Sequence, residues 1–246
     1  MRWPWDKSES EVDHSYLGEV ITNRVALSRP FLETNPDRYL ALTDAIIEEK
    51  LWEAAAGFTL EPDMIVTIAA NAAVPIMGLD MWAYRTVRSI IVHPTTTVTK
   101  GTRRGPSESV ASDAEVHIIG QASPYSGPLS LSWDAVAASS NAPHHGQNVV
   151  IHEFAHKIDM TDGEADGVPP LRRDSLQAWE DLLDREYRRS NSRESDWDLR
   201  AYAWTNKAEF FAVATESFFT TPEHLRQAKP DLFRGLCDFY CAQSPN

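Results

Sequence analysis

The chain has 246 residues, of which 42% are hydrophobic, so it is long enough and apolar enough to bury a large core. Acidic side chains outnumber basic ones by 36 to 23, and the formal net charge of -13 argues against general binding to nucleic-acid phosphates or anionic lipid. Two cysteines, Cys237 and Cys241, are too few for a disulfide framework, which favours a reducing, cytoplasmic compartment.

The N-terminus shows no secretory signal, because residues 1–15 contain no continuous apolar segment after the first basic residue. The most membrane-like run is 64–83, but Asn71, Pro75 and Asp80 interrupt it, and a spanning helix needs roughly 20 mostly apolar residues. We therefore expect no membrane segment and interpret this run as a buried helix that ends near Pro75.

The first helical signal is Asn35-Pro36, which has the form of an N-cap followed by proline at the first helical position. Apolar side chains continue from it at roughly helical spacing, namely Tyr39, Leu42, Ile46 and Leu51. These patterns predict an N-terminal helical layer over residues 1–84.

From about Arg85 the pattern changes to short strands bounded by turn formers. The β-type runs are SIIVHP (89–94), VHIIG (116–120) and PLSLSW (128–133). Between the first two, residues 95–113 are polar and rich in turn formers, which predicts an exposed loop. After Val149 the pattern becomes helical again. There is no internal repeat and no linker-like stretch, so we expect one α+β domain.

Residues 152–156 read HEFAH. On a helix, residues four apart lie on one face, so His152 and His156 can direct two imidazole nitrogens to one zinc ion. Glu153 projects about 100° away around the helix, where it can act as a general base without binding the metal. Such a short pattern also arises by chance on surface helices. A catalytic zinc site needs a third protein ligand, so the rest of the chain must supply one.

Two sources of a third ligand are weak. In one class of zinc peptidase, a glycine follows the second histidine by three residues and a ligand follows three further on. The corresponding positions here are Asp159 and Asp162, and the glycine is absent. His144 and His145 lie in APHHGQ, a turn-like segment in which exposed loop histidines are the simpler interpretation.

The stronger source is the apolar segment AEFFAVATESFF (208–219), because a carboxylate buried on such a helix needs a partner. It offers Glu209 and Glu216, which are seven residues apart and therefore nearly eclipsed on one helix face. Spacing alone does not choose between them.

The stretch YAWTNKAEFFA (202–212), placed after HEFAH, resembles the catalytic domain of anthrax lethal factor, a zinc peptidase. This resemblance implies that Glu209 is the third ligand and that Tyr202, seven residues earlier, assists catalysis. More of the chain is similar to the Mlc titration factor A family of zinc-dependent peptidases. The segments that carry this similarity are, in order, MRWPW, GFTL, IIVHP, GPLSLSW, HEFAHKIDM, DGVPPL and AEFFAVATESFF.

The family resemblance implies a helix-rich, gluzincin-like α+β metallopeptidase in one domain over 1–246, with a small mixed sheet and the zinc-site helices in 85–246. It implies a cytoplasmic aminopeptidase with one Zn²⁺ per chain and a peptide substrate. The exopeptidase motif GAMEN is absent, so aminopeptidase action rests on the resemblance alone. A rival function, also implied, is capture of a transcriptional repressor of sugar uptake, with or without hydrolysis. Glu153 favours the enzyme, because a pure binding module does not need it.

Metal-bound histidines usually donate their second nitrogen to a carboxylate or carbonyl. Asp159 and Glu216 are the candidates for this role, and Glu216 is the better one because its helix is more apolar. Peptidases of this architecture commonly hold substrate as an added strand, and PLSLSW is the candidate edge strand, although a buried strand has the same pattern. Cys237 and Cys241 lack the partners and spacing of a zinc site, so we expect them to pack on one helix face.

Overall fold

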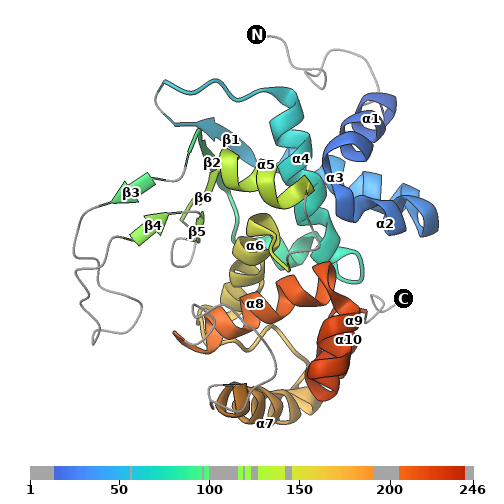
Figure 1. Cartoon of the computed structure of the whole chain (residues 1–246), viewed down its shortest axis with the longest axis vertical. Helices are drawn as coiled ribbons and strands as arrows, with labels where there is room; N and C mark the ends of the chain where they lie inside the picture. Colours follow the sequence, from blue (N-terminus) through green and yellow to red (C-terminus); the bar gives the residue numbers. More distant parts are fainter. Residues whose placement is uncertain are drawn as a thin grey trace.

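The computed structural model describes residues 14–55, 57–95, 97–99, 116–118, 120–122, 127–141, 146–190 and 205–241. In these ranges a small sheet lies at one side of a largely helical body, and the HEFAH helix lies between that sheet and the C-terminal helices (Figure 1). The predicted helix-rich α+β fold is confirmed. Buried apolar side chains from the first to the last described helix form one continuous core. The single domain over 1–246 stays a prediction.

The N-terminal layer contains α1 (His14–Arg24), α2 (Arg29–Thr34), α3 (Pro36–Glu49) and α4 (Pro62–Ala73), with 3-10 turns η1 (Ala26–Ser28), η2 (Val74–Ile76) and η3 (Met81–Tyr84). The predicted helix start at Pro36 is confirmed, although the Asn35 side chain makes no capping hydrogen bond. The predicted continuation to Leu51 is wrong. Lys50 has an extended backbone and ends α3, and Leu51 opens strand β1 (Leu51–Ala54), whose partner strand is distant in sequence.

Helix α4 runs through the interior of the helical layer. All of its residues from 65 to 73 are buried, and it packs against both α3 and the HEFAH helix. The predicted end near Pro75 is confirmed, because α4 ends at Ala73 and continues as the short turn η2. No helix in the described ranges is long and apolar enough to cross a membrane.

The main sheet is mixed and has the strand order β1-β2-β6-β5. Strands β1, β2 (Ser89–His93) and β6 (Leu129–Ser132) are parallel, whereas β5 (Gly120–Ala122) is antiparallel to β6. Strands β3 (Thr97–Thr99) and β4 (Val116–Ile118) form a separate antiparallel pair. The three predicted β-type runs therefore do contain strands.

Two details of the predicted sheet are wrong. Strand β6 lies between β2 and β5, so PLSLSW is an internal strand, and β5 is the outer strand on that side of the described sheet. Leu129 and Leu131 of β6 are fully buried, which agrees with the alternative interpretation of PLSLSW as a buried strand. The run 95–113 also contains β3, and the remainder of that predicted loop lies almost entirely outside the described residues.

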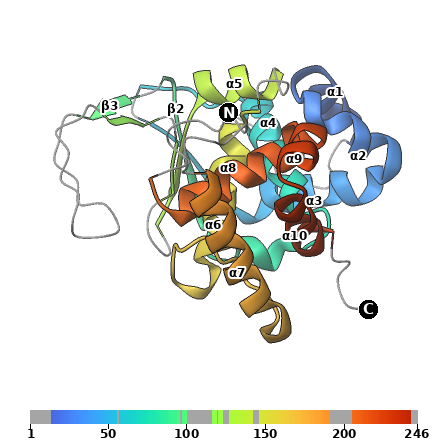
Figure 2. The same cartoon turned by 60° about the horizontal axis from the view of Figure 1, so that its bottom comes forward.

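The C-terminal part contains α5 (Trp133–Asn141), α6 (Val149–Asp159), 3-10 turn η5 (Met160–Asp162), α7 (Arg173–Ser190), α8 (Lys207–Thr220), α9 (Pro222–Ala228) and α10 (Pro230–Tyr240). Helix α5 was not predicted. Helices α7, α9 and α10 gather around α8, which in turn packs against α6 (Figures 1 and 2). Among the C-terminal helices α6 and α8 are the most buried, and they carry the predicted ligands.

Candidate metal centre

Helix α6 holds the HEFAH residues in its buried middle. Its N-cap is Asn148, whose side-chain Oδ1 accepts a hydrogen bond from the Ile151 amide at 3.1 Å. The His152 amide donates to the Asn148 carbonyl at 3.0 Å, so the first turn of the helix fixes the backbone of the first histidine. His152, Glu153 and His156 are 6%, 6% and 7% exposed. All three side chains are therefore buried.

Helix α8 brings Glu209 to the two histidines. Its N-cap Asn206 accepts the Glu209 amide through Oδ1 at 2.9 Å, which places this glutamate in the first turn. Phe210 and Phe211 follow it and are buried in ring contacts with Tyr187 and Trp179 of α7. These aromatic anchors hold the start of α8 against the core.

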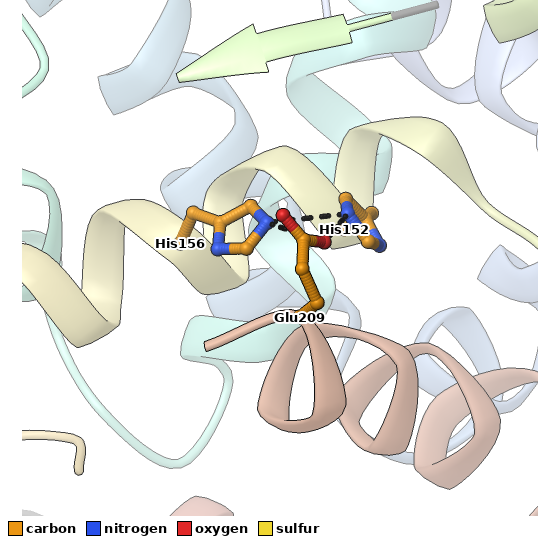
Figure 3. A group of neighbouring side chains, drawn as sticks. All are labelled: His152, His156 and Glu209. Carbon is orange, nitrogen blue, oxygen red and sulfur yellow. Dashed lines mark hydrogen bonds and ion pairs between the residues drawn. The ribbon is translucent and has the colours of Figure 1, made fainter. Parts of the chain in front are cut away.

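The ends of the three side chains meet at one point (Figure 3). His152 Nε2 and His156 Nε2 are 3.2 Å apart, and Glu209 Oε2 lies 3.2 Å from the first and 3.3 Å from the second. Burial alone would raise the pKa of the Glu209 carboxyl, but the two adjacent imidazoles hold it well below its usual range. The carboxylate is therefore ionised and available as a ligand.

This donor set fits a divalent metal. Two ligands held at about 2.0–2.1 Å from one tetrahedral ion lie roughly 3.3–3.4 Å apart, which matches the nearly equilateral triangle of nitrogen and oxygen atoms. Two imidazoles and one carboxylate are also a common set in catalytic zinc sites, which keep a fourth position open. His152, His156 and Glu209 are the one such group of metal-ligating residues in the described part of the chain.

Glu216 lies two turns after Glu209 on α8, on the other side of the His152 ring. Its Oε1 is 3.4 Å from His152 Nδ1, within ion-pair distance but without hydrogen-bond geometry, and its side chain is 1% exposed. The two glutamates thus face different nitrogens of one imidazole. Glu209 faces the metal-directed Nε2, and Glu216 faces the nitrogen that an outer partner would hold.

Asp159 has a different neighbour. Its Oδ2 accepts the Gly167 amide at 3.0 Å, its Oδ1 is buried without a hydrogen-bond partner, and no contact to a histidine ring nitrogen is seen among the described residues. Gly167 has φ of 81°, its carbonyl accepts the Trp179 indole N–H at 3.0 Å, and a side chain on it would begin 2.6 Å from the Lys207 carbonyl oxygen. Asp159 therefore ties the end of α6 to the loop that touches the start of α8.

Replacing Asp159 with asparagine should change how stability depends on pH. Burial raises the pKa of Asp159 to about 7, so the folded metal-free protein holds a proton that the unfolded chain releases near pH 4. The stability that this proton contributes is present below pH 4 and is lost as the pH rises to 7. Asp159→Asn should therefore gain stability relative to wild type over that window, reaching about 1–4 kcal/mol at pH 8. Urea unfolding in EDTA at several pH values measures this, and parallel curves would contradict it.

Sequence reasoning missed Lys157, the residue after the second histidine. It is fully buried, and its Nζ donates to the Gly127 carbonyl just before β6 at 3.2 Å. Burial lowers the pKa of Lys157 to about 8, while the negative charge of Glu153 opposes that fall. This lysine ties the metal helix to the sheet close to the proposed base. No sequence signal distinguishes it from an exposed lysine.

Some predicted residues cannot be placed. Tyr202, the predicted catalytic tyrosine, and the loop histidines His144 and His145 lie outside the described residues. The cysteines are described and carry no disulfide, and they lie four residues apart at the end of α10, as expected for one helix face.

A helix with two histidines and an intervening glutamate, facing a glutamate on a second helix, defines a metallopeptidase-type centre. Comparison with known proteins agrees, because residues 5–241 match the family described as Glucose-regulated metallo-peptidase M90. The chain belongs to this family. It is therefore a metallopeptidase by family, and the predicted membership is confirmed.

Individual relatives cover most of the chain. A protein of Synechocystis sp. described only as uncharacterized is 30% identical over 201 residues, which is 80% of this chain and 73% of the relative. Mlc titration factor A of Yersinia enterocolitica is 28% identical over 249 residues, covering 98% of this chain and 90% of that protein. The protein of the same name from Yersinia pestis is 27% identical, with 98% and 89% covered.

Proposed function

We propose that this chain is a zinc-dependent peptidase, acting as an aminopeptidase in the cytoplasm, with one Zn²⁺ held by His152, His156 and Glu209. The observation that carries the proposal is the triangle of three buried donor atoms 3.2–3.3 Å apart, in a chain of the metallopeptidase family. The donor set and its spacing favour zinc among divalent metals. The cysteine content and the family resemblance support the cytoplasmic location.

In the proposed mechanism the protein contributes a general base, a hydrogen-bond donor to the oxyanion and a carboxylate that orients a metal ligand. Zinc, when bound, would supply a Lewis acid that polarises the scissile carbonyl and lowers the pKa of water, so that water can lose a proton and attack near neutral pH. Glu153 takes the proton from the attacking water and delivers it to the departing amine. Tyr202 donates a hydrogen bond to the oxyanion that forms at the carbonyl. Glu216, whose Oε1 lies 3.4 Å from His152 Nδ1, would accept a hydrogen bond from the Nδ1 proton when the ion is bound, so that Nε2 keeps its lone pair for the ion.

The proposed substrate is a peptide with a free amino terminus, held as an extended strand. Strand β5 is the outer strand of the described sheet on one side and lies beside α6, so it takes the place that was predicted for β6. Preference for the amino-terminal residue rests on the family resemblance.

The proposal is tested by metal content and turnover on the same preparation. After dialysis, elemental analysis should give about one zinc per chain, and a panel of aminoacyl reporters should be hydrolysed. Matched peptides with an acetylated amino terminus should be resistant, because an aminopeptidase needs the free amine. Zinc far below one per chain would contradict the metal assignment, whereas equal cleavage of blocked and free peptides would contradict only the aminopeptidase assignment.

A second candidate function is supported by the names of relatives. Proteins called Mlc titration factor A share nearly the whole length of this chain, and that name describes titration of Mlc. This chain could likewise capture a transcriptional repressor, with or without hydrolysing peptides. The two functions separate experimentally when the base is removed and the metal ligands are kept.

A further inference from the structure

A network of buried polar side chains connects α4 to the start of the metal helix. Asn71 of α4, Ser140 of α5 and Asn148 before α6 are 0%, 1% and 0% exposed. Helices α4, α5 and α6 pack against one another (Figure 1), and α4 lies about sixty residues before the other two in sequence. A polar side chain in the middle of an apolar helix such as α4 is costly unless its hydrogen bonds are made.

Asn71 uses its whole side-chain amide. Its Nδ2 donates to the Thr67 carbonyl at 2.8 Å and to Ser140 Oγ at 3.0 Å, and its Oδ1 accepts Asn148 Nδ2 at 2.7 Å. The Ser140 hydroxyl donates a hydrogen bond to the Val136 carbonyl at 2.7 Å, so Ser140 Oγ is the acceptor for Asn71 Nδ2. The hydrogen-bond directions are thus set along the network, and each member has one arrangement that satisfies it.

Asn148 connects this network to the first turn of the metal helix. The amide group that donates to Asn71 also caps Ile151 through Oδ1, and the backbone carbonyl of Asn148 accepts the His152 amide. One side chain therefore connects α4 to the backbone of the first metal ligand. Glu209 is held separately, by the N-cap Asn206 on α8.

We propose that Asn71 is a positioning residue for the metal centre. Through Asn148 it sets the rotation and axial position of the first turn of α6, and thereby the distance between His152 Nε2 and Glu209 Oε2. This inference rests on the proposed metal site. A site with ligand atoms 3.2–3.3 Å apart tolerates displacements of only about 0.5 Å, so a residue that fixes one ligand helix against the other controls affinity.

The test measures metal binding and coordination geometry directly. Purified metal-free protein is titrated with Co²⁺, and then with Zn²⁺ against a chelator, while the visible absorption spectrum of the bound cobalt is recorded. Asn71→Ala should lower the affinity for both metals by roughly 10-fold, the lower end of the loss seen when residues that hold metal ligands are removed. Its cobalt spectrum should also change in intensity and shape, because the spectrum follows the ligand arrangement.

A second variant keeps the test informative if Asn71→Ala does not fold. Asn148→Ser retains a good N-cap oxygen for α6 but removes the donor to Asn71, so it should reproduce the metal effects of Asn71→Ala. The double variant should bind metal no more weakly than either single variant, because both changes break one connection.

The control is Ile46→Ala, which opens a cavity in the core on α3. It should lower the thermal midpoint and leave cobalt affinity and spectrum unchanged. Wild-type metal binding in both Asn71→Ala and Asn148→Ser, or an equal loss of affinity in Ile46→Ala, would overturn the inference. A wild-type protein that binds neither Co²⁺ nor Zn²⁺ would instead contradict the proposed function.

Discussion

Glu153→Gln is expected to lose hydrolysis by at least roughly 10²-fold, the usual contribution of a general base. The amide keeps the shape of the carboxylate but cannot accept the proton of the attacking water. The proposed ligands His152, His156 and Glu209 are unchanged, so zinc occupancy should stay near one per chain. Initial rates on aminoacyl reporters, together with elemental analysis of the same samples, measure both quantities.

Two comparisons make this result specific. Glu180→Gln makes the same chemical change on the exposed face of α7 and should retain wild-type turnover. Binding of a repressor, where it occurs, should survive in Glu153→Gln, because capture needs the surface and not the base. Peptide cleavage at the wild-type rate in Glu153→Gln would mean that another group acts as the base or that a contaminating peptidase is present.

Glu209→Ala is expected to strip the metal, whereas Glu216→Ala should keep it with reduced affinity. The first change removes one of three protein ligands from a site that also leaves a position open. The second removes a partner of His152 Nδ1, which typically costs 10–100-fold in affinity, and the loss in Glu209→Ala should exceed this. Chelator competition and zinc content after dialysis give the order of the two losses.

These two variants are matched controls for each other. The glutamates lie seven residues apart on α8, both are changed to alanine, and their carboxylates approach the same imidazole from opposite sides. If Glu216→Ala loses the metal and Glu209→Ala retains it, the two residues exchange roles and the ligand assignment is wrong. Equal retention in both would place the third ligand elsewhere in the chain.

The part of the site that sequence predicts best is local. Four-residue spacing on one helix face is enough to bring His152 and His156 together. The choice between Glu209 and Glu216 is not local, because seven residues restore nearly the same rotation and differ by about 10 Å along the axis. Only the placement of α8 against α6 decides which carboxylate meets Nε2. The resemblance to known peptidases supplied that information.

The errors in the predicted fold have the same physical origin. Leu51 continues an apolar helical spacing, but its strand is defined by pairing with β2, almost forty residues later, and its side chain is 69% exposed. The place of β6 within the sheet depends on strand order, which the pattern of a single strand does not contain. Asn71 likewise interrupts an apolar run, and only contacts with α5 and α6 reveal why it is there.

Gly167 allows the loop that follows α6 to lie directly against the start of α8. Backbone meets backbone at this position, since a first side-chain carbon there would begin 2.6 Å from the Lys207 carbonyl oxygen, two residues before Glu209. The spacing between this loop and the first turn of α8 is therefore set by two backbones and leaves no room for a side chain at this position. A related protein with any larger residue here would need a differently shaped loop to keep the same start of the helix that carries Glu209.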